Sequence, residues 1–483
     1  MRHACIFRSA SLVWLTLVPV AHATTLYVSP TGTDTTTCTR DAPCALGTAA
    51  NNADAGDTVI LLDGVYKSQL WVKNTGTSSA WITFQADECA TPIIEGKGIE
   101  TDTDQPMGVG SNTANYVRFV GIVARGWNIG FGNGWIKDTA ATISNGHIEY
   151  KYCIAQGNGR TGFTFFSAEG IHIQNCISAH NGSSVAHSWS SGISLFEAQG
   201  SGNLVEGSVA FENTDAQQHT DGSGFIADEH SNGASFVNNV AFRNGGSCMR
   251  VTVSSDVKFI NNTCYHNAQD LLATGPDNPS EIYVTDEGSR SGMVVKNNTF
   301  YSTGNGPGAK AVFGQAVTGW SNNAVQDGGN VTVFTAPDGT NPDFTLASSA
   351  SSLTGKGAAG NGAPTTDIGF DPKCITKKAP TMIGDYTKAD WWQYSVDIDY
   401  IKSIGGVARC FRPRTRSGTP DIGAYANGGV TALTDTCTRS TGGAPSNGGA
   451  SSAGGATANG GTSTGNGGTS SKGGTTNESG GTS

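Results

Sequence analysis

A phrase that recurs through the middle of the chain constrains its fold more than any other feature. It reads Asn-Val-Ala-Phe-Arg-Asn at residues 239–244 and Asn-Thr-Cys-Tyr-His-Asn at residues 262–267, with shorter copies starting at 153, 176, 208, 298 and 323. Successive copies are 23, 32, 31, 23, 36 and 25 residues apart. A short minimum spacing with variable additions is typical of a β-solenoid, in which repeats stack as coils and insertions form loops.

The pattern inside each coil predicts which side chains face the core. Because successive side chains of a strand point to opposite faces, Val257 and Phe259 are expected inside and Lys258 outside. The first residue of several copies is asparagine, and amides at one position of successive coils can hydrogen-bond as a ladder. The residues predicted to form this ladder are Asn239, Asn262, Asn298 and Asn323.

The ends of the chain differ from its middle. Residues 1–23 have the composition of a signal peptide, with an apolar run over 12–20 and a small-residue cleavage site, Ala21-His22-Ala23, so we expect export. No later stretch is apolar enough to span a bilayer. The predicted parts are an N-terminal cap with the first coils (24–115), the repeats (116–330), an irregular C-terminal cap (331–430) and a flexible Gly/Ser/Thr-rich linker (438–483).

Charge and cysteine content narrow the classes of partner. A net charge of −10 argues against nucleic acid and against an anionic membrane surface. We expect a monomer, with attachment to a cell surface through the C-terminal tail as an option.

Ten of eleven cysteines follow the signal, and Cys38 and Cys44 could close a small loop. Cys153 and Cys176 share one repeat position, so they either pair or form a buried thiol ladder; zinc-ligand spacing is missing.

Three segments resemble a known family. Residues 27–34, 55–66 and 421–425 are similar to the opening and closing motifs of bacterial right-handed parallel β-helix proteins. The opening is shared by chondroitinase-B-like and family-9 pectate-lyase-like enzymes, and Ala426 stands where glutamate is usual. The resemblance implies an all-β fold, a right-handed parallel β-helix, over about residues 25–428. It specifies activity less well, because this scaffold hosts lyases, hydrolases and non-catalytic surface proteins.

Insertions indicate where a functional site lies. They enlarge the coils at 176–208, 208–239 and 262–298, and aligning coils backward from the asparagines sets Ala227-Asp228-Glu229 opposite Arg250-Val251-Thr252. Asp286 and Glu287 are expected one coil further on. We therefore predict a site in which Arg250 lies between carboxylate pairs.

The predicted roles follow from the chemistry of these side chains. Arg250, Asp228, Glu229 and His219 are the catalytic candidates, and Asp221, Asp228 and Glu229 are the candidate Ca²⁺ ligands. Ca²⁺ would offset the acidic charge of both protein and substrate. Trp189, Asp286 and Glu287 are the candidate substrate-binding residues.

The sequence is compatible with three functions. A lyase would remove the proton α to a uronate carboxylate, with Arg250 as the candidate base. A hydrolase would use two carboxylates as acid and base. In the third reading the charges are a solvated face of a glycan-binding or surface protein. A lyase acting on an acidic polysaccharide is the leading interpretation.

The chain departs from the family-9 pattern at the positions that matter for chemistry. The family's Asp-Asp-Gly-x-Asp calcium motif has its nearest match in Ser-Ser-Gly-Ile-Ser at residues 190–194, and serines cannot supply those charges. The family's catalytic lysine would fall near Ser247 or Cys248. A G-x-G-x-x-G match at residues 157–162 lies in a turn that no helical pattern follows, so it does not indicate a dinucleotide site.

Overall fold

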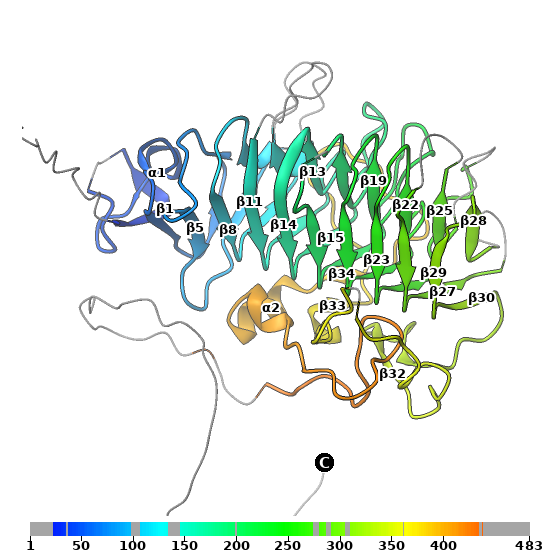
Figure 1. The fold of residues 1–483 in the computed structure, drawn as a ribbon. Coiled ribbons are helices and arrows are strands. Elements are labelled where there is room, and N and C mark those ends of the chain that lie inside the picture. Colours follow the sequence, from blue (N-terminus) through cyan, green and yellow to red (C-terminus); the bar gives the residue numbers. More distant parts are fainter. Residues whose placement is uncertain are drawn as a thin grey trace, which may run out of the picture. The chain divides into compact units, whose positions relative to one another are not determined.

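Stacked parallel strands dominate the chain. The computed structural model describes residues 23–34, 37–97, 107–133, 145–198, 200–273, 280–285, 291–304, 310–360, 362–433 and 437. In this part the strands form three long parallel sheets, stacked as the coils of a right-handed β-helix (Figure 1). The expected fold class is confirmed. The signal peptide lies almost wholly outside the described residues and the C-terminal tail lies outside them, so both stay predictions.

The eleven-stranded sheet shows the expected alternation of core and surface residues. Val257 and Phe259 are fully buried and Lys258 is exposed, as predicted. In order across the sheet, its strands are β1 (Thr25–Thr33), β2 (Thr58–Leu61), β5 (Ile82–Ala86), β8 (Val117–Val120), β11 (Asn145–Lys151), β14 (Ala168–Gln174), β17 (Leu204–Glu206), β20 (Ser235–Val237), β23 (Lys258–Ile260), β26 (Val294–Lys296) and β29 (Gly319–Ser321).

The nine-stranded sheet carries the candidate functional site on its outer face. Its inward side chains, such as Phe163 and Phe225, belong to the core of the coils. In order, its strands are β28 (Val312–Gly314), β25 (Ile282–Val284), β22 (Met249–Val251), β19 (Phe225–Asp228), β16 (Ile193–Phe196), β13 (Phe163–Phe166), β10 (Ile129–Asn133), β7 (Met107–Ser111) and β4 (Leu70–Trp71).

The ten-stranded sheet is covered on its outer face by the segment that follows the coils. Phe242 and Tyr265 point outward and meet Phe344 with ring centroids 5.1 and 5.5 Å apart. In order, its strands are β3 (Val65–Tyr66), β6 (Ile93–Glu95), β9 (Val123–Arg125), β12 (Ile154–Gln156), β15 (Ile177–Ala179), β18 (Val209–Phe211), β21 (Val240–Phe242), β24 (Thr263–Tyr265), β27 (Thr299–Ser302) and β30 (Ala324–Asp327).

Short elements complete the described part. Helix α1 (Leu46–Asn52) buries Leu46, Ala49 and Ala50 and contacts β1 and β4 at the N-terminal end of the coils (Figure 1). The covering segment contains β31 (Phe334–Ala336), β32 (Asp343–Leu346), η2 (Pro372–Cys374), β33 (Ile375–Thr376), β34 (Ser395–Val396), α2 (Ile398–Ile404) and η3 (Val407–Cys410). Among the described residues, no helix is both long enough and apolar enough to cross a membrane.

The predicted asparagine ladder is present. Asn239 Nδ2 donates to Asn262 Oδ1 at 3.0 Å, and Asn262 Nδ2 donates to Asn298 Oδ1 at 2.9 Å. Asn298 Nδ2 continues the ladder to Asn323 Oδ1 at 2.9 Å. Each oxygen also accepts the backbone N–H of the preceding ladder residue. The ladder therefore satisfies buried polar groups at a corner where the chain leaves the eleven-stranded sheet.

A second ladder runs beside the first and was not predicted. Its asparagines stand five residues after the first residue of a repeat copy, as Asn244 does after Asn239 and Asn267 after Asn262. It ends on a carboxylate, because Asn267 Nδ2 donates to Glu281 Oε2 at 2.7 Å. Its members are Asn158, Asn181, Asn213, Asn244, Asn267 and Glu281, joined by hydrogen bonds of 2.7–2.9 Å. The sequence signal was the second asparagine of the recurring phrase, which recurs at the same five-residue offset in weaker copies.

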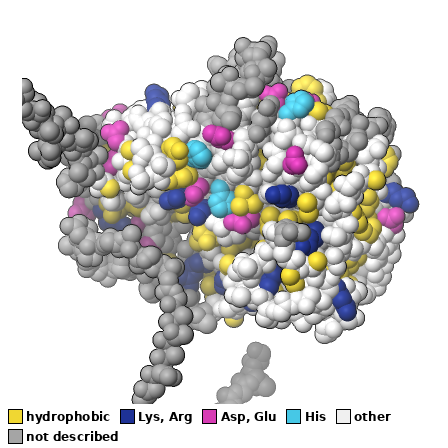
Figure 2. Space-filling model, in the orientation of Figure 1, with side chains coloured by type: hydrophobic (Ala, Val, Ile, Leu, Met, Phe, Trp, Pro, Cys, Tyr) yellow, Lys and Arg dark blue, Asp and Glu magenta, His cyan; other side chains and the backbone are white. Residues whose placement is uncertain are grey.

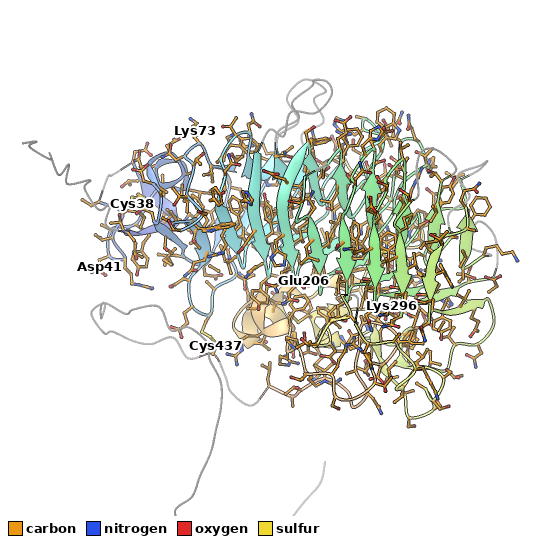
Figure 3. The ribbon with its side chains drawn as sticks, in the orientation of Figure 1. Cys38, Asp41, Lys73, Glu206, Lys296 and Cys437 are labelled. Carbon is orange, nitrogen blue, oxygen red and sulfur yellow. A yellow bond between two sulfur atoms is a disulfide. The ribbon has the colours of Figure 1, made fainter. Side chains whose placement is uncertain are left out.

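The cysteines fit an oxidising compartment. Cys38 and Cys44 form the expected small loop, and Cys89 is joined to Cys437, which lies beside α2 (Figure 3). Cys153 and Cys176 are buried and unpaired as a disulfide, and the Cys153 N–H donates to Cys176 Sγ at 3.4 Å. Of the two open alternatives for this pair, the structure has the thiol ladder. The other described disulfides are Cys248–Cys264 and Cys374–Cys410.

We predict that Asn262→Ala destabilises the protein by about 1–3 kcal/mol, because it leaves buried donors of Asn239 without an acceptor. Thermal unfolding measured by circular dichroism checks this. Lys258→Ala, an exposed change in the same coil, is the control and should shift the free energy of unfolding by less than about 0.5 kcal/mol. Equal melting temperatures for the two variants would contradict a stabilising ladder.

Candidate functional site

A cavity of about 310 Å³ opens on the outer face of the nine-stranded sheet. Its wall comes from strands β13, β16, β19 and β22 and from the turns that precede or follow them. The residues that line it are Arg160, Thr161, Thr164, Phe166, Trp189, Ser194, Phe196, Asp221, Asp228, Glu229, Arg250 and Thr252. Five of the sequence-predicted site residues therefore lie around one cavity.

Several of these side chains lie in turns that begin at asparagines of the second ladder. Between a ladder asparagine and the next strand of the nine-stranded sheet, the chain forms a turn of variable length. Arg160 lies in the turn between Asn158 and β13, and Trp189 lies in the longer turn that precedes β16. Asp221 lies in the turn that precedes β19. The ladder fixes where each turn begins, so insertions of different length converge on one place.

The register between β19 and β22 differs from the predicted one. Ile226, not Ala227, pairs with Arg250, and Ala227 pairs with Val251. The corner after β19 is one residue longer than the backward alignment assumed, and both Glu229 and His230 have positive φ there. The shift matters because a displacement of one residue moves a strand side chain to the other face. In the observed register Asp228 and Arg250 both point to the outer face.

Arg250 is held as a cation. Its Nη1 donates to Asp221 Oδ1 at 2.6 Å and to the carbonyl oxygen of Thr220. The guanidinium carbon also lies 5.3 Å from the centroid of the Tyr283 ring. The side chain exposes only 10% of its surface. Because the neighbouring carboxylate stabilises the protonated guanidinium, these contacts suit a fixed positive charge and not the predicted role of base.

The acidity of Asp228 is strongly altered in the cavity. Its pKa is raised to about 8, chiefly by burial and also by the negative charges of Asp221 and Glu229, and the positive charge of Arg250 opposes this rise. The raised pKa therefore favours the protonated carboxyl group near neutral pH. A protonated carboxyl beside ionised ones is a common arrangement at sites of acid–base chemistry.

Asp215 holds the backbone at Asp221 in place, and Arg160 adds a positive charge near the Asp221 carboxylate. Asp215, whose pKa burial raises to about 6, accepts hydrogen bonds from the backbone N–H groups of Ser190, Thr220 and Asp221. It thereby ties two turns of the site together. Burial lowers the pKa of Arg160, while Asp215 and Asp221 raise it. Sequence reasoning missed Arg160, although it lies in the G-x-G-x-x-G match that was set aside as a turn.

Aromatic side chains give the cavity an apolar side. Trp189 exposes 58% of its surface, and the Phe166 and Phe196 rings lie 5.7 Å apart. An exposed tryptophan beside polar groups suits contact with the apolar face of a sugar ring. The prediction that Trp189 binds substrate thus has the required position, and the role itself stays a prediction.

The remaining predicted residues lie elsewhere. His219 does not line the cavity, and its Nδ1 makes a hydrogen bond of 2.7 Å with Asp270 Oδ2. Asp286 and Glu287 lie outside the described residues. On the face drawn in Figure 2, acidic and basic side chains are interspersed, so the charge of −10 does not form one continuous acidic surface there.

The donor set of the cavity does not fit Ca²⁺. This ion takes about six to eight oxygen ligands, several of them from carboxylates that converge on one point. Within the described ranges, the one group of three carboxylate, thiol or imidazole ligand atoms lying within 4.8 Å of one another belongs to Cys248, Cys264 and Glu281. Asp221, Asp228 and Glu229 therefore do not converge within that distance, and Asp221 is already paired with Arg250.

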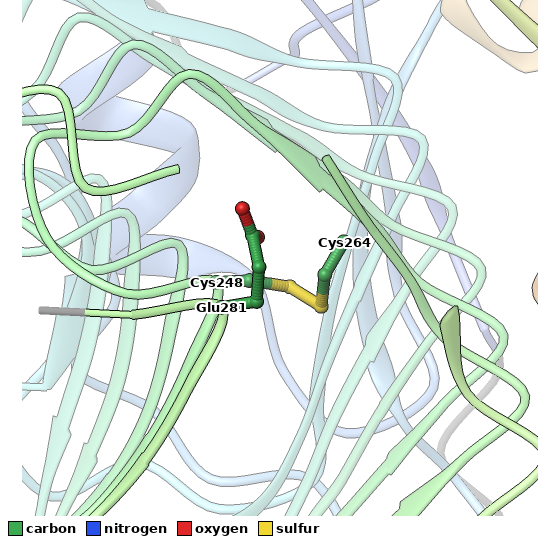
Figure 4. A group of neighbouring side chains, drawn as sticks. All are labelled: Cys248, Cys264 and Glu281. Carbon is green, nitrogen blue, oxygen red and sulfur yellow. A yellow bond between two sulfur atoms is a disulfide. The ribbon is translucent and has the colours of Figure 1, made fainter. Parts of the chain in front are cut away.

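The Cys248, Cys264 and Glu281 group is not a metal site either. The two sulfur atoms are joined in a disulfide, so neither is a thiolate that could bind a metal (Figure 4). Both oxygens of Glu281 instead accept hydrogen bonds from Asn267. This group ends the second ladder and is structural.

The comparisons with known proteins agree with this architecture. Residues 26–245 match the family described as Pel9A-like, right handed beta helix region. This stretch, which is less than half of the chain, resembles that family and has the right-handed β-helix fold. The family resemblance stated from the sequence is thus confirmed for the Pel9A-like region, which includes Asp221, Asp228 and Glu229 but ends before Arg250.

Individual relatives support the fold more than a specific activity. The chain is 27% identical over 217 residues to pectate lyase PEL9 of Emericella nidulans, covering 42% of this chain and 51% of that protein. It is 39% identical over 75 residues to the uncharacterized protein YwoF of Bacillus subtilis, covering 15% and 16% of the two chains. It thus spans about half the length of the curated pectate lyase, so an activity for the whole protein is a proposal.

A solved structure of the same kind extends the fold similarity. The crystal structure of pectate lyase Pel9A matches with a TM-score of 0.50 and 17% identity, covering 77% of this chain and 98% of that one. At this identity the match establishes the shared fold alone. Together, the matches support a right-handed β-helix of the pectate-lyase-like kind.

We predict that Glu281 makes the stability of the protein depend on pH. Burial raises its pKa from 4.5 to about 8, although two hydrogen bonds from Asn267 lower it. The folded-state pKa of Glu281 is above the unfolded-state pKa. The stability that its protonated form contributes is therefore fully present below about pH 4.5 and is lost as the pH rises to about 8.

Glu281→Gln should remove this component, so its melting temperature should rise relative to the wild type between pH 5 and pH 8. Thermal unfolding at several pH values measures the difference. Asp41→Asn, which changes an exposed carboxylate, is the control. A constant difference between Glu281→Gln and wild type across this range would contradict the raised pKa.

Proposed function

We propose that this protein is a secreted lyase that cleaves an acidic, uronate-containing polysaccharide by β-elimination. One observation supports this proposal most strongly. Two arginines, Arg160 and Arg250, line the same cavity on the outer face of the nine-stranded sheet as the carboxyl groups of Asp228 and Glu229. Fixed cations beside acid–base groups are what the reaction requires. The Pel9A-like region supports the reaction class, and the disulfides support an oxidising compartment.

The reaction assigns a part to each group. A base removes the proton α to the uronate carboxylate, the electron pair forms the new C=C bond, and the bond to the glycosidic oxygen breaks. Arg250 stabilises the negative charge that develops on the carboxylate, since its own charge is held in place by Asp221. Glu229 takes the proton, and Asp228 supplies one to the leaving oxygen.

Trp189 and Arg160 act on binding in this proposal. The exposed indole of Trp189 packs against a sugar ring at the rim of the cavity. Arg160, which is mostly buried, adds positive charge for the uronate carboxylate. The substrate carboxylate thereby meets two guanidinium groups despite the acidic net charge of the chain.

Glycoside hydrolysis is the second candidate, and one observation favours it. The cavity holds a protonated carboxyl, Asp228, next to the carboxylates of Asp221 and Glu229. A general acid and a general base on two carboxyl groups are the pairing that hydrolases use. A hydrolase would not produce an unsaturated sugar, so product chemistry separates the two. A protein that only binds glycan would release no product.

We predict that the protein produces unsaturated ends from at least one of pectate, alginate and chondroitin. The measurement follows ultraviolet absorbance and reducing ends together, with neutral glycans as controls. Equal growth of both signals supports the lyase. New reducing ends without a rise in ultraviolet absorbance would contradict the lyase and support the hydrolase. Saturable retention of a glycan without either signal would make this a binding protein.

Arg250→Ala should lower kcat/KM by about 10²–10³-fold, the usual loss when one group that stabilises developing charge is removed. Arg118→Ala is the matched control. Arg118 is also paired with a carboxylate, Glu149, and lies over an aromatic ring, Trp81, but belongs to the eleven-stranded sheet. Melting temperatures of both variants show whether folding is intact. Full activity of Arg250→Ala would remove this residue from the mechanism.

A further inference from the structure

The ion pair of Arg250 and Asp221 lies where the acidic groups of the cavity gather. Arg250 Nη1 is 2.6 Å from Asp221 Oδ1, and both side chains are mostly buried, with 10% and 7% exposed. Asp228 and Glu229 line the same cavity. A buried carboxylate needs a positive partner, and here that partner is supplied by the chain itself.

The position of Arg250 is fixed from several sides. The carbonyl oxygen of Thr220 accepts a second hydrogen bond from Nη1, and the Tyr283 ring lies 5.3 Å from the guanidinium carbon. Thr220 and Asp221 are in turn held by Asp215, which accepts their backbone N–H groups. The charge is therefore preorganised and does not depend on an ion from solution.

We propose that the guanidinium of Arg250, with Arg160 beside it in the cavity, takes the place of a divalent cation, so this site binds the carboxylate of an acidic oligosaccharide without Ca²⁺. The inference rests on the proposed function for its substrate class. Guanidinium groups suit the task, because their planar N–H donors match the two oxygens of a carboxylate.

Replacement of Arg250 should change which cations the cavity attracts. Arg250→Gln removes the positive partner of Asp221 and leaves the carboxylates of Asp221 and Glu229 beside Asp228. Their mutual repulsion then favours a cation from solution. Ca²⁺ binding should therefore appear in this variant, because the Asp221 side chain, without its ion pair to Arg250, can turn toward Glu229, although these carboxylates do not converge in the natural chain.

The first test measures thermal unfolding with millimolar Ca²⁺ and with chelator, and it needs no substrate. The wild-type melting temperature should be the same in both. Arg250→Gln should melt lower than wild type in chelator and rise by several degrees with Ca²⁺. Arg118→Gln, which removes an arginine from the single carboxylate of Glu149 and leaves Lys151 at 3.7 Å from it, should show no response to Ca²⁺.

Two outcomes overturn the proposal. A Ca²⁺-dependent rise in the wild type that Asp221→Asn or Asp228→Asn abolishes would show that these carboxylates already hold the ion. Absence of a Ca²⁺ response in a folded Arg250→Gln protein would show that Arg250 does not occupy a cation position. If Arg250→Gln does not fold, the wild-type measurement and calorimetry of the wild type decide.

The calorimetric test uses trigalacturonate as the probe. Its Kd for the wild type should be the same, within twofold, in chelator and in Ca²⁺. Weakening of tenfold or more in chelator would overturn the cation-free site. Absence of binding in both conditions would count against the proposed uronate substrate, and the unfolding experiment would still decide the Ca²⁺ question, so the two failures are distinguishable.

Discussion

The stacking of one coil on the next is the constraint on which the rest of this structure depends. Backbone hydrogen bonds of three parallel sheets set the spacing, and two amide ladders hold the corners where the chain turns between sheets. An amide side chain suits this position because it donates to one neighbour and accepts from the other. The corners stay aligned while the turns between them vary in length.

The candidate site uses this division between fixed corners and variable turns. Trp189 and Asp221 come from turns that start at ladder asparagines, whereas Asp228 and Arg250 come from the outer face of adjacent strands. Function therefore depends on few positions of each coil, and most of the coil is scaffold. Charge in the site is balanced internally by Arg250 and Asp221, which would let an acidic protein take the acidic polysaccharide that we propose as its substrate.

Much of the fold could be predicted from the sequence, because a coil repeats a local pattern. The phrase at residues 262–267 predicted the first ladder, and the alternation around Phe259 predicted which face is buried. The site was predicted less completely. The pairing of Arg250 was displaced by one residue because the length of the corner at Glu229 leaves no local signal. Arg160 was missed because only three-dimensional stacking brings its turn to the cavity.

A crystal structure of the Glu229→Gln protein with an acidic oligosaccharide, grown in chelator, tests the central claim most directly. The substitution should slow the reaction and leave the arginines in place. The account predicts a uronate carboxylate on the guanidinium of Arg250 and a sugar ring against Trp189, with no ion between them. Oligosaccharide bound on another face, or a metal ion between the sugar and Asp221, would contradict it.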